Sequence, residues 1–254
     1  MYEKAKKLIS LSTIRRIGWR SASREATEIG ALLLLFVFQG GLFGILFFGG
    51  TTLWHILKEK KEGVRGPMLV WAIMNILFAR GAGIWATGAL SQVFFFAVSV
   101  LLYLMVRRIP LPFLKKEKEE GAREVANTGL VFLVLMSGTY LRDIGRFWAF
   151  DILILASIGV LLYEEGKKEG IPRKRNLLAA GIGALLSLEV AWIMDFLPLH
   201  PIGLSAGLAL IYLTLKCVFR RSWAGGLRVK AVLQEILVFT AIMLLILSTT
   251  SWGM

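Results

Sequence analysis

The sequence predicts an all-α fold, a polytopic transmembrane helical bundle with seven to eight membrane segments arranged largely as tandem helical hairpins. Two observations predict this fold. Of the 254 residues 56% are hydrophobic, and the mean hydropathy is +0.68, so little polar surface is left to cover a soluble domain. Apolar runs of about 20 residues, the length that crosses a hydrocarbon core of about 30 Å, recur along almost the whole chain. We therefore expect a multi-pass protein of the cell membrane, with the lipid bilayer as its solvent.

The chain is expected to begin with a basic N-terminal arm, residues 1–28, followed by a single transmembrane domain, residues 29–254. The apolar residues of the arm spread around a helix at 100° per residue, which disfavours a surface-lying amphipathic helix. The next apolar run is much longer than the core of a signal peptide and has no clear cleavage site. We therefore expect no removable signal.

Residues 29–57 admit two arrangements. A single crossing would place the basic arm and the next basic cluster on opposite sides of the membrane. A segment that dips and returns at Gln39-Gly40-Gly41 would keep all basic clusters on one side, but each half would be short for a full crossing. Both arrangements stay open from the sequence.

The later apolar segments form three pairs and one final span. Residues 66–106 carry Arg80 as their only charge and are long enough for two spans, with the turn expected at residues 80–88. The second pair is divided by three charged residues, and the third by two prolines, which tend to end helices. The expected segments are 66–82, 86–106, 125–141, 147–163, 176–196, 198–219 and 232–250.

The charge distribution predicts the orientation. The net charge is +13, and 27 of the 30 Lys and Arg fall in five clusters that alternate with the apolar blocks. Cytoplasmic loops of membrane proteins retain such residues. We therefore expect the basic loops in the cytoplasm and the hairpin tips outside, and we expect no nucleic-acid partner. The clusters cover residues 4–24, 58–65, 107–123, 167–175 and 216–230.

Each hairpin pair follows a similar Lys- and Glu-rich segment that ends in glycine. These segments are residues 58–63, 116–121 and 166–170. They have the composition of helix ends that run into water. An internal repeat of about 50 residues is one explanation, although Lys and Glu runs of low complexity match easily.

The composition also limits the chemistry and suggests a source. Cys217 is the only cysteine, so neither an internal disulfide nor a thiolate metal cluster can form. The chain has only three Asn and three Gln beside abundant Glu, Lys and Arg, a balance that favours a thermophile source. The scarce amide side chains, Asn75 among them, are expected to form hydrogen bonds between helices.

The candidate site residues gather at the predicted outer hairpin tips. All three aspartates of the chain lie there, together with the three arginines outside the clusters and one histidine. Arginine can hold a phosphate or carboxylate by paired hydrogen bonds, and aspartates can coordinate a hard cation or relay protons. The proposed substrate-binding residues are Arg80, Arg142, Arg146 and His200, and the proposed proton or cation residues are Asp143, Asp151 and Asp195.

A simpler interpretation of the same residues is local pairing. Arg146 would pair with Asp143, and Asp151 with Arg142 or Arg80, so that the charges only fix the tips at the membrane surface. The sequence favours this interpretation slightly. It predicts no bound metal and names no cofactor.

Glu189 is the remaining candidate, because it lies well inside an apolar segment and its own helix offers no obvious cation. An ionisable group in the hydrocarbon costs at least a few kcal/mol, so it needs a partner or a purpose. Glu189 is either a protonated structural residue that bonds to a neighbouring helix, or a proton or cation site.

Several activities are excluded by missing motifs. The chain has neither a G-x-x-x-x-G-K-[ST] loop nor an H-E-x-x-H pair, and two distant histidines make a bis-histidine haem improbable. A G-x-S-x-G pattern around Ser205 opens an apolar helix, whereas a nucleophile elbow needs a strand before the helix.

The function that the sequence favours is a permease, or a membrane subunit of a transport complex with other protein subunits. A membrane-embedded enzyme that acts on lipid-linked phosphate is the alternative, and a structural membrane scaffold is a third. The sequence leaves open whether the chain is an enzyme.

Overall fold

The computed structural model describes residues 23–59, 63–85, 89–107, 119–196, 201–223, 233–234, 237–242 and 248. Helices and their short connections make up these residues, and no strand occurs among them. The first helix covers residues 23–37, and a short helical stretch near the C-terminus covers residues 237–242. Between them stand α2 (Leu42–Lys58), α3 (Arg65–Trp85), α4 (Ala89–Val106), α5 (Glu119–Asp143), α6 (Phe147–Lys168), α7 (Arg173–Asp195) and α8 (Pro201–Trp223).

Four of these helices are long and apolar enough to cross a membrane, which agrees with an all-helical membrane protein. They are Glu124–Asp143 within α5, and the whole of α6, α7 and α8. Leu42–Lys58 and Ser91–Val106 are apolar but shorter. α5 lies in the middle of the bundle, where it contacts α3, α4, α6 and α8.

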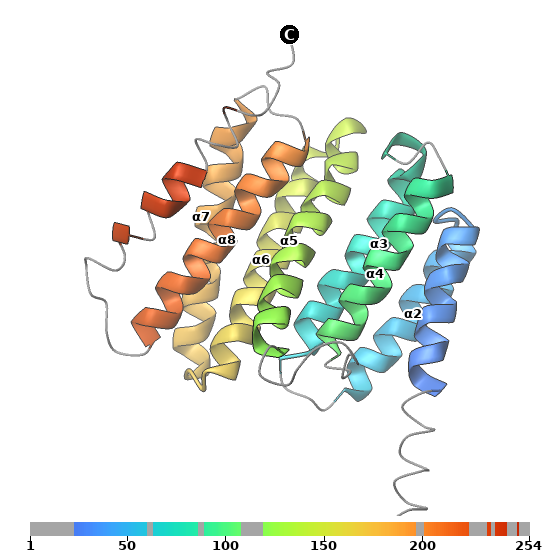
Figure 1. Cartoon of the computed structure of the whole chain (residues 1–254), viewed down its shortest axis with the longest axis horizontal. Helices are drawn as coiled ribbons and strands as arrows, with labels where there is room; N and C mark the ends of the chain where they lie inside the picture. The colour runs from blue at the N-terminus through green and yellow to red at the C-terminus, as the bar shows by residue number, and fades with distance from the viewer. Residues whose placement is uncertain are drawn as a thin grey trace, which may run out of the picture.

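The helices run side by side and alternate in direction (Figure 1). We call one end of the bundle the inner end: α2, α4, α6 and α8 finish there, and α3, α5 and α7 begin there. It lies at the bottom of Figure 1. The described members of the basic clusters lie at or near this end, and we call the opposite end the outer end.

Residues 29–57 fold as two helices joined by a tight turn. The first helix ends at residue 37, and α2 begins at Leu42 after a tight turn. Gln39 and Gly40 in this turn have φ angles of 48° and 65°. A Cβ on Gly40 would lie 2.9 Å from the backbone of Arg80, so the turn packs directly against α3. Residues 29–57 therefore do not form one continuous helix, and how they cross a membrane stays a prediction.

Several expected boundaries shift: α5 begins at Glu119 instead of residue 125, and α6 ends at Lys168 instead of residue 163. The first helix includes residues 23–28, which the sequence assigned to the basic arm; residues 1–22 lie outside the described part. α3 continues to Trp85, so the expected turn at residues 80–88 starts too early. Of the expected last span, 232–250, the structure describes only residues 233–234, 237–242 and 248.

A buried polar network joins α3 to α4. Asn75 donates a hydrogen bond to the carbonyl of Trp71 at 2.8 Å and accepts one from the hydroxyl of Ser99 at 2.6 Å. The indole of Trp71 donates to the carbonyl of Ser99 at 2.9 Å. The predicted interhelical hydrogen bond of Asn75 is confirmed.

Candidate functional site

At the outer end, the structure brings three of the predicted site residues close to one another. Arg142 at the end of α5 forms an ion pair with Asp195 at the end of α7, with Nη1 2.9 Å from Oδ1. Asp151 on α6 accepts a hydrogen bond from the indole of Trp192 at 3.3 Å. Arg142 therefore pairs with Asp195 rather than with Asp151, and the contacts link α5, α6 and α7.

The other outer residues do not join this group. Arg80, Asp143 and Arg146 are exposed, and none of them forms an ion pair with a described residue, so the expected pairing of Arg146 with Asp143 is not formed. His200 lies outside the described residues. Within the described part of the chain, no three His, Cys, Asp or Glu side chains come close enough together to hold a metal ion.

Glu189 is exposed on the side of α7 that does not contact the other described helices. It forms no hydrogen bond or ion pair with the residues that the structure describes. The expected hydrogen bond to a neighbouring helix is therefore not made within this part of the chain.

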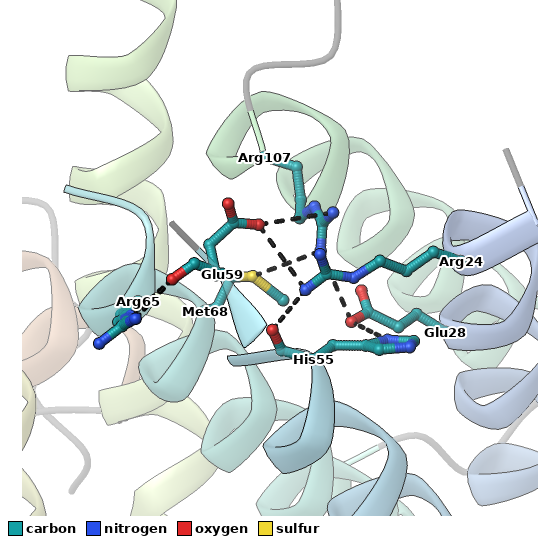
Figure 2. Close-up of polar contacts among 7 residues, drawn as sticks. All are labelled: Arg24, Glu28, His55, Glu59, Arg65, Met68 and Arg107. Carbon is teal, nitrogen blue, oxygen red and sulfur yellow. Dashed lines mark hydrogen bonds and ion pairs between the residues drawn. The ribbon is translucent and has the colours of Figure 1, made fainter. Parts of the chain in front are cut away.

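The most buried charges lie at the inner end, where the sequence predicted only solvated loops. One group, which we call the N-terminal cluster, consists of Arg24 and Glu28 on the first helix, His55 on α2, Glu59 just after α2, and Arg107 just after α4. Figure 2 shows these side chains converging from three elements. Glu28, Glu59 and Arg107 are all buried.

Each acid of the N-terminal cluster contacts two basic groups. Nδ1 of His55 lies 2.5 Å from Oε1 of Glu28, and a guanidinium nitrogen of Arg107 lies 3.7 Å from the same oxygen. Arg107 also lies 3.5 Å from Glu59, and Arg24 lies 3.7 Å from Glu59. Two arginines therefore balance two carboxylates, with the histidine beside them.

Backbone and sulfur contacts hold the N-terminal cluster in place. Arg24 donates to the carbonyl of His55. Arg65, at the start of α3, donates to the carbonyl of Glu59 from Nε at 2.8 Å and from Nη2 at 2.6 Å. Arg107 also contacts the sulfur of Met68 at 3.9 Å (Figure 2). The cluster thus connects the first four helices.

A second group, the C-terminal cluster, connects α5, α6 and α8. Nζ of Lys216 on α8 lies 2.8 Å from Glu165 on α6 and 3.7 Å from Glu124 on α5. Arg220, one turn further along α8, lies 3.0 Å from Glu124 and 3.4 Å from Glu169. The side chain of Lys216 is buried, whereas that of Arg220 is half exposed.

The two clusters use corresponding positions in two sets of four helices. In the first set Arg107, after the fourth helix, reaches Glu28 on the first helix and Glu59 at the end of the second. In the second set, α5–α8, Arg220 near the end of the fourth helix reaches Glu124 on the first and Glu169 at the end of the second.

Three short sequence matches occur in the same regions, but they align Glu25 rather than Glu28 with Glu124, and Glu62 rather than Glu59 with Glu169. R-E-x-x-x-x-G occurs at 24–30 and at 123–129, K-K-E-G at 60–63 and at 167–170, and R-R at 107–108 and at 220–221. Gly63 and Gly170, which end the second pair of matches, both have a φ of 72°. These spacings fit a repeat of on the order of 100 residues better than the interval of about 50 suggested by the Lys- and Glu-rich segments alone.

A small cavity of about 30 Å³ lies at the inner end between the two sets. By volume it has room for a water molecule or two. Glu164 contributes a buried carboxylate oxygen that has no hydrogen-bond partner among the described residues, and Asn127 donates to Glu165 at 3.4 Å. The first set lines it with Gly63, Pro67 and Val106, and the second with Glu124, Ala126, Asn127, Leu161, Glu164, Glu165 and Lys168.

A larger apolar groove of about 750 Å³ runs along α5 and α8. Gly121, Val125, Gly129 and Phe132 line its α5 side, and Ala206, Ala209 and Leu213 line its α8 side. Glu124 lines both this groove and the small cavity. The apolar groove therefore ends beside the C-terminal cluster.

No family model matches the chain, and neither the curated proteins nor the solved structures include a significant match. The site must therefore be interpreted from its own geometry.

Sequence reasoning missed the members of both clusters, which are Arg24, Glu28, His55, Glu59, Arg107, Glu124, Glu165, Glu169, Lys216 and Arg220. All ten stand close to the Lys- and Arg-rich inner loops, where charged side chains are ordinarily solvated. One indication was present, because every acid on that side is a glutamate, whereas all the aspartates lie toward the outer end. Ser205 is an ordinary helix residue, whose hydroxyl bonds to the carbonyl of Pro201 at 2.8 Å.

Proposed function

We propose that the chain is a multi-pass protein of the cell membrane with its inner end in the cytoplasm. The first helix and α2–α8 would form four hairpins that enter from that side. Support comes from the position of the basic clusters, since Lys and Arg concentrate in cytoplasmic loops. The first helix and α2 are the weakest candidates for a full crossing, because 15 and 17 residues span only about 22 and 25 Å.

We further propose that the protein is a permease, or the ion-conducting membrane subunit of a transport complex, that moves protons or small cations. The observation that carries this proposal is the cavity between the two helix sets, with Glu124, Glu164 and Glu165 on its wall and Lys216 buried behind them. Ionisable groups within a membrane domain are expensive, and they typically mark ion or proton pathways.

The position of the cavity adds support. Transporters built from two repeats hold their substrate at the interface between the repeats, near the middle of the membrane, and open it by moving one repeat against the other. Here the cavity also lies between the two four-helix sets and is lined by both, but it lies at their inner end. Because the cavity has a volume of only about 30 Å³, the two helix sets would have to move relative to each other before ions could pass.

A scaffold explains the ion pairs less well. A buried ion pair is weak support for stability, since apolar residues of similar volume often stabilise as much or more. Each of the two clusters contains buried charged side chains. Transport of ions therefore explains them better than a contribution to the stability of the fold.

The test is ion flux through the purified full-length chain in liposomes. An imposed potential is combined with a fluorescent pH dye, and sodium and potassium gradients are tested separately. We expect flux in the native protein, at least a tenfold loss in Glu165→Gln, and little change in Glu25→Gln. Glu25 is a partly exposed acid on the first helix that forms no ion pair with a described residue. Equal flux in protein-free liposomes, or equal loss in both variants, would contradict the proposal.

One observation favours the second candidate, an enzyme that handles lipid-linked phosphate. The apolar groove along α5 and α8 could hold an acyl or isoprenoid chain, and it ends where Arg220 could meet a phosphate. Filling the groove by Gly129→Leu would then abolish turnover of an added lipid-linked phosphate without changing ion flux.

A further inference from the structure

His55 is the only member of the N-terminal cluster that ordinarily changes its charge between about pH 5 and pH 8. The arginines of the cluster stay protonated in this range. The imidazole is nearly buried, with 12% of the side chain exposed, and its Nδ1 lies 2.5 Å from Oε1 of Glu28. Glu28 itself is completely buried. A proton on His55 therefore adds its charge inside the cluster and not in solvent.

Three charged side chains act on His55 from the elements packed against it. Glu28 and Arg24 belong to the first helix, and Arg107 follows α4 (Figure 2). Arg107 lies 3.7 Å from the same oxygen of Glu28 that contacts the imidazole, so the two basic groups share one acceptor. The other described titratable groups near this end of the same elements and of α3 are Glu25, Lys58, Glu59, Arg65 and Tyr103.

The charges of the N-terminal cluster balance while His55 is neutral. Arg24 and Arg107 carry two positive charges, and Glu28 and Glu59 carry two negative ones. An imidazolium is a third positive charge in a group whose carboxylates are already paired. Like charges repel each other most strongly where water is excluded. Acid therefore weakens the contacts of the arginines with the cluster.

The N-terminal cluster is connected to the wall of the small cavity. Pro67 and Val106 line this cavity on the side of the first helix set. Each of them is followed in the chain by one partner of a single contact, in which Arg107 touches the sulfur of Met68 at 3.9 Å. A displacement of Arg107 is therefore passed to the backbone beside both lining residues.

We propose that His55 is a pH sensor at the inner end, and that its protonation releases Arg107 from Glu28 and loosens the wall of the small cavity. The imidazolium takes over Oε1 of Glu28 and repels the guanidinium that shares this oxygen. Arg107 follows the end of α4, so it can turn toward water and keep its charge solvated. The first helix and α2 then lose a link to α4, and the inner end opens. This opening does not depend on transport.

The distance between the first helix and α6 at the inner end tests the sensor. Ala26→Cys on the first helix and Lys167→Cys on α6 place spin labels at two exposed positions, and Cys217→Ser removes the exposed native thiol. Pulsed EPR in lipid nanodiscs measures the distance between the labels at about pH 7.5 and at about pH 5. We expect a longer or broader distance at the lower pH, because the link between Glu28 and Arg107 is lost.

Two histidine variants show whether His55 causes the change. His55→Asn keeps an amide donor in the place of Nδ1 but cannot gain a charge, so we expect the native distance of the higher pH at both pH values. His200→Asn is the matched control, because His200 is the only other histidine of the chain, and it should keep the native response. A native distance that is the same at both pH values, or a response that survives in His55→Asn, would overturn the sensor.

Discussion

Lys216 on α8 and Glu165 on α6 form a buried ion pair, with 2.8 Å between Nζ and Oε1 and with only 6% and 13% of the two side chains exposed. Each charge offsets the desolvation of the other. The loss of either partner would leave an uncompensated charge inside the bundle.

Lys216→Met is therefore expected to lower the free energy of unfolding by ~3–5 kcal/mol, because Glu165 would remain buried without its cation. Arg220→Met is the control, since this side chain is 54% exposed and its ion pairs are largely solvated. Its loss should cost less than about 1 kcal/mol. Unfolding in mixed micelles measures the loss of free energy in both variants. Equal losses would show that the ion pair of Lys216 is as weak as a surface ion pair.

Gly166→Ala should destabilise the inner end of α6. A Cβ at this position would lie 2.6 Å from Cγ of Asn176 and 3.0 Å from the ring of Trp223. Asn176, which donates to the carbonyl of Tyr163 at 2.7 Å, would have to move and lose this hydrogen bond. We expect a loss of about 1–3 kcal/mol.

Gly49→Ala is the matched control for that substitution. Gly49 is also inside a helix, but nothing lies within 4 Å of the position that a Cβ would take there. Alanine at this position should stabilise by about 0.5–1 kcal/mol, because it favours the helix. A stabilising Gly166→Ala would mean that α6, α7 and α8 are packed less closely than described.

Cysteine labelling in intact cells tests the proposed orientation of the chain in the membrane. In a Cys217→Ser background, Asp143→Cys at the outer end should react with a membrane-impermeant reagent, and Lys116→Cys should react only after the cells are permeabilised. The physical reason is the retention of Lys- and Arg-rich loops in the cytoplasm. Labelling of position 116 in intact cells, with none at position 143, would reverse the proposed topology.

The sequence predicts the helices well but the site poorly. Runs of apolar residues locate α3–α8 to within six residues, and the largest differences are at the charged ends of α5 and α6, which extend beyond the apolar runs. The burial of Glu28, Glu59 and Lys216 depends on which helix ends meet, and no single segment contains this information. Charged side chains beside Lys-rich loops look solvated until α4 and α8 bring Arg107 and Lys216 against them.

Glu189 is a residue for which the sequence predicts burial but the structure shows exposure. Its depth within an apolar segment predicts burial, yet depth along a helix says nothing of which side faces a neighbour. On α7, Ser187 and Leu188 face the bundle and are buried, while Glu189 is exposed. Because α7 is apolar on every side, its periodicity could not distinguish these faces.

We propose that the buried charges of the C-terminal cluster, whose Glu124 and Glu165 line the cavity between the two helix sets, serve ion movement rather than stability. The double variant Lys216→Met, Glu165→Leu tests it most directly, because apolar residues replace the whole pair and leave no buried charge unpaired. Replacement of a buried ion pair in this way is commonly neutral or stabilising. We predict that the double variant unfolds at the same denaturant concentration as the native protein or a higher one, and that its ion flux in liposomes falls at least tenfold. A stable double variant with native flux would contradict the account and leave the ion pairs a purely structural role.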